Sequence, residues 1–161
     1  MKKQLIFTGV LLLASAVTGE AMATCTANRV TGVQTLLSGN TICVAKAGGG
    51  WESQEQHYTP VSGVGQLWDY KLGPTSPTNQ VDPSKQLGTW KQTTGTGLGN
   101  VLVSYTYNAF TPSSPTTLVF QIYRISGTLG AAGSIYEFCT ASGATPSATG
   151  TLKLGVTGGC P

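Results

Sequence analysis

Short runs of alternating residues, separated by clusters of Gly, Pro, Asn and Ser, constrain the fold of this chain more than any other feature. In the clearest run, Val101–Tyr107, the odd-numbered positions are apolar or aromatic, and Ser104 and Thr106 lie between them. Successive side chains of a β-strand point to opposite faces, so this run presents one apolar face and one polar face. Runs of this length bounded by turn residues are typical of antiparallel all-β domains.

Eight such runs follow one another along the chain, and they are residues 40–45, 51–58, 66–72, 88–93, 101–107, 118–125, 134–140 and 151–156. A barrel closed from about eight strands has an interior just wide enough for side chains to fill. We therefore predict an all-β fold, an eight-stranded antiparallel meander closed as a small barrel, with a β-sandwich as the alternative. Apolar residues at helical spacing before the first strand predict a short helical turn near residues 30–37.

The N-terminal residues have the pattern of an export signal. Two lysines precede an apolar run, Leu5–Val17, and small residues ending at Ala23 follow it. The run is shorter than the roughly twenty residues that a membrane-spanning helix requires. We expect residues 1–23 to be a signal peptide and residues 24–161 to form a single barrel-like domain, periplasmic or extracellular, with no membrane span.

Four cysteines follow the expected cleavage point, and they are Cys25, Cys43, Cys139 and Cys160. An even number of cysteines in a small exported chain predicts disulfides, here two. Of the three possible connectivities we favour the local one, which joins Cys25 to Cys43 and Cys139 to Cys160; the rival joins Cys25 to Cys160. No pair has the C-x-x-C spacing of a zinc site, and the single histidine lies far from all four, so we expect no metal and no cofactor.

Charge is sparse and scattered in this sequence. Charged residues make up 9% of the chain, compared with about 25% in a typical soluble protein. The net charge is +3, and the basic residues do not cluster in the sequence, which argues against a nucleic-acid partner or an anionic membrane surface. A surface rich in Gly, Ser and Thr suits an exported β protein, and it also suits self-association with neighbouring copies.

The second predicted strand, residues 51–58, has no apolar face. Alternation places Glu55 and His57 on the same face as Trp51 and Ser53. In a closed barrel one face of this strand points inward, and buried polar groups need partners or a ligand. The alternative is an exposed edge strand, whose charges would discourage edge-to-edge association.

A candidate ligand-binding site follows from this strand and its neighbours, and its residues are Trp51, Glu55, His57, Asp69, Tyr70 and Trp90. We expect most other aromatic side chains at strand positions to fill the barrel core.

Several short segments carry a resemblance, and they are residues 36–41, Leu67 with residues 69–71, Gly88-Thr89-Trp90, and Tyr136-Glu137-Phe138-Cys139. They resemble segments of a group of small secreted proteins of Gram-negative bacteria with no assigned function, which are similar to lipocalin and calycin barrels. Gly88-Thr89-Trp90 also resembles a lipocalin signature, although it lies in the middle of the domain here and not on the first strand. The resemblance implies a small antiparallel barrel and no particular activity.

Three functions remain open at this point. The leading hypothesis is a non-enzymatic binding module that holds an unknown small ligand in the barrel mouth or an envelope protein on its rim. The alternatives are a structural or adhesive subunit of a cell surface or filament, and a hydrolase that uses His57. The sequence contains no nucleophile elbow, zinc-protease motif, phosphate loop or calcium loop, so we assign no catalytic residue.

Overall fold

The computed structural model describes residues 25–26, 28–70, 84–96, 100–108, 114–143 and 145–161. The predicted signal peptide lies outside these residues. Within the described part of the chain, no helix has the length and apolar character needed to cross a membrane.

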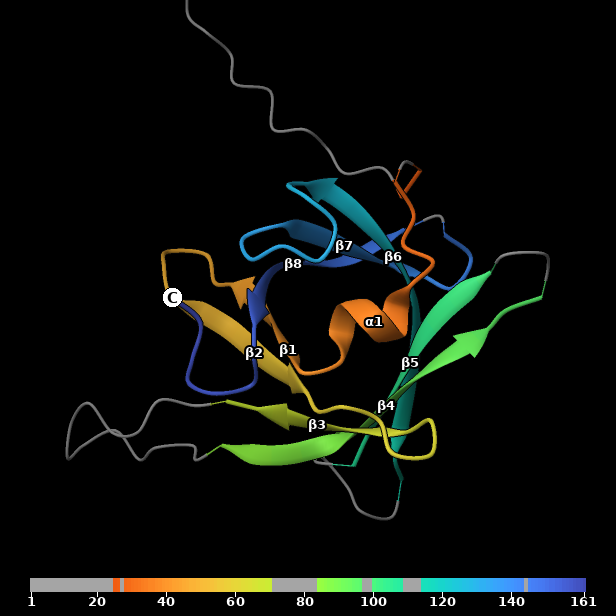
Figure 1. Cartoon of the computed structure of the whole chain (residues 1–161), viewed down its shortest axis with the longest axis horizontal. Helices are drawn as coiled ribbons and strands as arrows, with labels where there is room; N and C mark the ends of the chain where they lie inside the picture. The colour runs from red at the N-terminus through yellow and green to blue at the C-terminus, as the bar shows by residue number, and fades with distance from the viewer. Residues whose placement is uncertain (1–24, 27, 71–83, 97–99, 109–113, 144) are drawn as a thin grey trace, which may run out of the picture.

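The described residues form eight strands, and they are β1 (Asn40–Ala45), β2 (Trp51–His57), β3 (Gly65–Asp69), β4 (Lys85–Thr94), β5 (Val101–Tyr107), β6 (Thr116–Ser126), β7 (Ile135–Thr140) and β8 (Pro146–Leu154). Each strand pairs antiparallel with the next, and β8 pairs with β1 to close the barrel (Figure 1). The predicted eight-stranded meander is confirmed, and the β-sandwich alternative is wrong. The edge-strand interpretation of β2 is also wrong, because β2 pairs with β1 on one side and β3 on the other.

Alternation along the strands fills the interior with large side chains, and the fully buried ones on strands include Ile42, Leu67, Trp90, Val103, Ile122, Tyr136 and Leu152. Gly65 on β3 lies opposite Trp90 on β4. A Cβ atom at Gly65 would overlap Trp90 Nε1, which donates a hydrogen bond of 3.1 Å to the Tyr58 carbonyl. A glycine is therefore required where the indole crosses the sheet.

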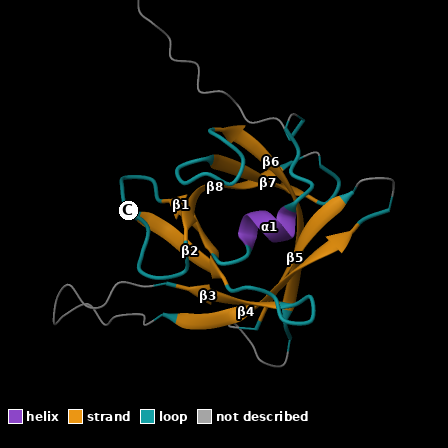
Figure 2. Cartoon of the chain, viewed as in Figure 1, coloured by secondary structure: helices purple, strands orange, loops and turns teal. Residues whose placement is uncertain are grey.

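The short helix α1 (Val33–Leu37) plugs one end of the barrel. It lies inside the ring of strands in Figure 2, and it contacts β1, β4 and β5. Its apolar side chains Val33, Leu36 and Leu37 are buried in the same core as the strand residues. The predicted helical turn is confirmed over these five residues; Val30 lies before the helix because its N–H donates to the Ile122 carbonyl on β6.

The disulfides join Cys25 to Cys139 and Cys43 to Cys160, so the predicted local pairing is wrong, and so is its rival. Residues 28–30 pair with the part of β6 that extends beyond its pairing with β5, which brings the N-terminal segment to β7 and Cys139. The closure of β8 onto β1 likewise delivers the C-terminal segment to Cys43 on β1. Each bridge therefore spans more than a hundred residues of sequence, 114 and 117 positions respectively.

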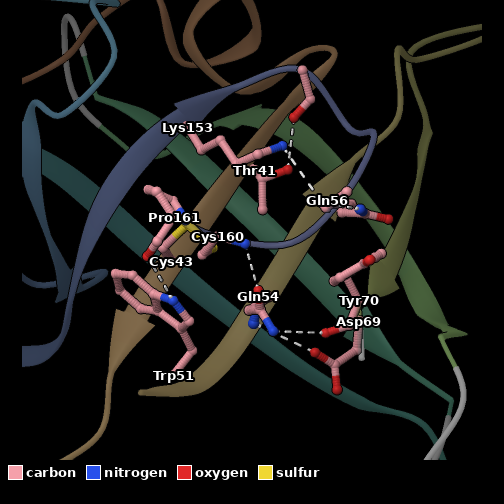
Figure 3. The surroundings of a disulfide bond; sticks show 12 residues. Thr41, Cys43, Trp51, Gln54, Gln56, Asp69, Tyr70, Lys153, Cys160 and Pro161 are labelled. Atoms are coloured by element: carbon pink, nitrogen blue, oxygen red, sulfur yellow. Dashed lines mark hydrogen bonds between the residues drawn. A yellow bond between two sulfur atoms is a disulfide. The ribbon is translucent and has the colours of Figure 1, made fainter. Parts of the chain in front are cut away.

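Residues 155–161, which we call the C-terminal strap, cross the outer face of β1 and β2 (Figure 3). The N–H of Cys160 donates to Gln54 Oε1 over 2.6 Å, and Gln56 Nε2 donates to the Gly158 carbonyl over 3.4 Å. These bonds explain why both glutamines are buried although they point away from the barrel interior. The polar outer face of β2 is thus occupied by the chain itself.

Candidate functional site

A cavity of about 780 Å³ opens at the end of the barrel opposite α1. The helix leads into the first residue of β1, whereas the cavity is lined by the last residues of that strand, Val44 and Ala45. Its apolar wall comes from four strands and includes Ile42, Val44, Leu118, Phe120, Phe138 and Ala148. Polar groups from β2 and β5 also reach the lining, and they include Ser53, Glu55, Tyr105 and Tyr107.

Glu55 is the central polar group of this cavity. Its position on β2 lies between Ile42 on β1 and Asp69 on β3, so the three residues point to the same side of the sheet. The Tyr107 hydroxyl donates a hydrogen bond of 3.0 Å to Glu55 Oε1. Burial raises the pKa of Glu55 to about 7; the bond from Tyr107 acts in the opposite direction, and the nearby Asp69 raises the pKa further.

No Lys or Arg is among the described residues that line the cavity, whereas Glu52 at its mouth adds a second carboxylate. Burial also raises the pKa values of Tyr105 and Tyr107, and the adjacent Glu55 contributes to both shifts. Both phenols therefore stay protonated and can donate hydrogen bonds at neutral pH.

His57 lies one layer below the cavity and does not line it. Its Nε2 atom is 2.9 Å from the Tyr105 hydroxyl, and its ring packs edge-on against Trp90 with centroids 5.4 Å apart. Burial lowers the pKa of His57 to about 4, and the backbone groups of Glu55 and Asn40 offset the shift only in part. The imidazole is therefore neutral at pH 7, with its Nδ1 atom buried and without a hydrogen-bond partner in the described part of the chain.

The structure brings four of the six predicted site residues into the barrel interior. Glu55 lines the cavity, Asp69 is its buried neighbour, and His57 and Trp90 form the layer beneath. Asp69 Oδ1 also accepts a bond of 3.4 Å from the Gln54 N–H.

The other two predicted residues, Trp51 and Tyr70, lie outside the barrel beside the C-terminal strap (Figure 3). The register of β1 with β2 skips Glu52, and this bulge interrupts the alternation that would have placed Trp51 on the same face as Glu55. The Trp51 indole instead donates to the Pro161 carbonyl over 3.2 Å. The Tyr70 ring packs on Gly159, where a Cβ atom would lie 2.7 Å from Tyr70 Cε1.

Sequence reasoning missed the aromatic residues of the cavity wall, which are Tyr105, Tyr107, Phe120 and Phe138. Alternation correctly places Tyr105 and Tyr107 on the inner face of β5, but aromatic side chains at such positions usually serve only as core. The contact of Tyr107 on β5 with Glu55 on β2 could not be read from spacing, because β3 and β4 lie between these strands in the sheet and the contact crosses the barrel interior.

One buried group of potential metal ligands, Cys25, Glu137 and Cys139, lies on the outer face of β7. The two sulfur atoms are bonded to each other, so neither is a thiolate. Glu137 Oε2 instead accepts the Cys25 N–H over 3.1 Å, which anchors the N-terminal segment.

Comparison with known proteins finds no matching family model, no matching curated protein and no matching solved structure. The architecture is that of a closed eight-stranded antiparallel barrel, a general form that lipocalins also have. The two disulfides point to an oxidising, exported environment.

Proposed function

We propose that this protein is a periplasmic or extracellular binding protein that holds a small, mainly apolar ligand in the open end of its barrel. The observation that carries the proposal is the cavity itself. Its volume of about 780 Å³ falls within the roughly 300–1,000 Å³ of typical small-molecule sites. An apolar wall with a few converging polar groups is the usual composition of such sites.

The other two functions receive less support. A hydrolase that uses His57 would need the imidazole to reach its substrate, but the ring is fully buried and lies outside the cavity lining. A filament subunit that assembles by strand exchange would need a free sheet edge, and the closed barrel pairs every strand on both sides. The resemblance to small secreted barrels agrees with export and with the barrel fold, and it favours none of the three functions.

A neutral fluorescent probe, N-phenylnaphthylamine, tests the proposal by its gain in emission on binding to an apolar site. We expect the wild-type protein to bind it and Ala148→Phe to bind it about tenfold more weakly or worse, because the added ring occupies the cavity. Ala141→Phe is the matched control, because Ala141 is exposed in the β7–β8 connection and does not line the cavity. Equal binding by the wild type and Ala148→Phe, or no binding by the wild type, would refute the proposal.

A further inference from the structure

We propose that the cavity takes ligands that carry a protonated amine on an apolar or aromatic body, with Glu55 as the counter-ion of the amine. This inference rests on the proposed binding function and names the chemical class of its ligand. Three features of the described residues support it: the charge of the lining, the unused bonding capacity of Glu55, and the aromatic wall beside that carboxylate.

The charge of the lining has one sign. Glu52 and Glu55 contribute carboxylates, and none of the described lining residues is Lys or Arg. A cleft lined by one sign of charge with low-dielectric walls attracts ligands of the opposite charge and repels ligands of the same charge. The lining therefore favours a cation over a fatty acid or another carboxylate ligand.

Glu55 has bonding capacity left over for such a ligand. An ionised carboxylate offers about four acceptor sites, and the Tyr107 hydroxyl donates to Oε1 from a distance of 3.0 Å. Glu55 is only partly exposed and lies among apolar and aromatic groups, so further donors or a counter-charge would stabilise its ionised form. An ammonium group supplies three donors and the charge together.

The rings next to Glu55 suit the rest of the ligand. The Tyr105 ring centroid lies 6.0 Å from those of Tyr107 and Phe120 and 6.5 Å from that of Phe138. Aromatic faces attract cations within about 6 Å of the ring centroid, and they also pack against apolar groups. One end of the cavity wall can therefore hold the ammonium while the remainder holds the apolar body.

The ionisation of Glu55 makes this binding depend on pH. The titratable and charged groups around Glu55 are Asp69 on β3, Lys85 opposite Asp69 on β4, Tyr105 and Tyr107 on β5, and Glu52 and His57 on β2 itself. The pKa of His57 is about 4 and both phenols stay protonated, so none of these three changes charge between about pH 6 and pH 8. With its pKa of about 7, Glu55 goes from mostly protonated to mostly ionised over that range, and amine affinity should rise about tenfold.

Displacement of N-phenylnaphthylamine by phenylbutylamine, phenylbutanol and phenylbutyrate tests the inference, because the three share one apolar body and differ in charge. We expect the amine to bind most tightly and the carboxylate most weakly. Glu55→Gln, which keeps the side-chain shape, should weaken the amine about tenfold or more and leave the alcohol within about twofold. Lys91→Gln is the control for loss of one charge, because Lys91 is exposed on β4 and does not line the cavity; it should leave the binding of all three compounds within about twofold.

Different outcomes distinguish failure of amine recognition from failure of the proposed ligand-binding function. If the alcohol or the carboxylate binds the wild type as tightly as the amine, or if Glu55→Gln leaves amine binding unchanged, the inference falls while probe binding still supports a ligand cavity. If neither the probe nor any of the three compounds binds, the proposed function falls with it. The pH dependence of amine binding to the wild type requires no variant, and a flat profile between about pH 6 and pH 8 would also overturn the inference.

Discussion

Glu55 and His57 lie two positions apart on β2, and burial shifts their pKa values in opposite directions. The pKa of Glu55 rises from 4.5 to about 7, and the pKa of His57 falls from 6.5 to about 4. Each shift is about 2.5 units, and at about 1.4 kcal/mol per unit each group changes the free energy of unfolding by about 3 kcal/mol across its titration range. Water in the open cavity screens Glu55, so its figure is an upper value.

The two contributions have opposite slopes with pH. For Glu55 the folded-state pKa is above the unfolded-state pKa, so its contribution is complete below about pH 4.5 and is lost as the pH rises through about 7. For His57 the folded-state pKa is the lower one, so its contribution is complete above about pH 6.5 and is lost as the pH falls through about 4. Between about pH 4.5 and pH 6.5 the two slopes cancel, and the pair leaves wild-type stability nearly level.

Single substitutions should unmask each slope. In Glu55→Gln only the His57 slope remains, so relative to the wild type the free energy of unfolding gains up to about 3 kcal/mol between pH 4.5 and pH 7. In His57→Gln only the Glu55 slope remains, and stability should fall over the same range. Because His57→Gln also loses ring packing, slopes and not absolute values are compared.

Urea unfolding followed by tryptophan fluorescence between about pH 4 and pH 8 measures these slopes, since Trp90 is buried beside His57. The other titrating groups are common to the three proteins and cancel in the differences. Wild-type and Glu55→Gln curves that run parallel across this range would refute the assignment of a proton-retaining carboxyl to this position.

Three further outcomes are expected. Tyr105→Phe removes the hydroxyl partner of the buried imidazole and should lower the free energy of unfolding by about 1–3 kcal/mol in urea titrations, whereas a neutral effect would show that the bond at 2.9 Å contributes nothing. Gly65→Ala should destabilise the barrel by about 1–3 kcal/mol because its Cβ overlaps the indole on β4. Gly32→Ala is the control, because nothing lies within 4 Å of its Cβ; it should cost less than about 1 kcal/mol in the same assay, through the weaker preference for alanine at the N-cap of α1. Replacing both Cys43 and Cys160 by Ser should lower the thermal midpoint, because the disulfide that closes this long loop stabilises the fold by about 4–5 kcal/mol in the chain-entropy model. Peptide mapping without reductant that failed to find these two residues joined would contradict the pairing.

The barrel itself could be predicted from the sequence because its strands are specified locally. Alternation along Val101–Tyr107, and turn residues at regular spacing, identify strands without knowledge of their neighbours. The same period of two places Glu55 and His57 on one face, and closure of the sheet turns that face toward the barrel interior. The polar interior of the barrel is therefore already present in the pattern of one strand.

Long-range pairing decided the remainder. The disulfide partners depend on which strand each chain end lies beside. Pairing of β8 with β1 places the C-terminal segment next to Cys43, and pairing of residues 28–30 with β6 places the N-terminal segment near Cys139. The position of Trp51 depends on a single skipped residue in the register, and a skip of one residue reverses the face on which a side chain lies. The cavity forms between residues of strands distant in sequence, and α1 fills only the other end of the barrel. Local periodicity determines on which face of the strand a side chain lies. Only closure of the sheet determines which residues, cavity or chain segment that face contacts.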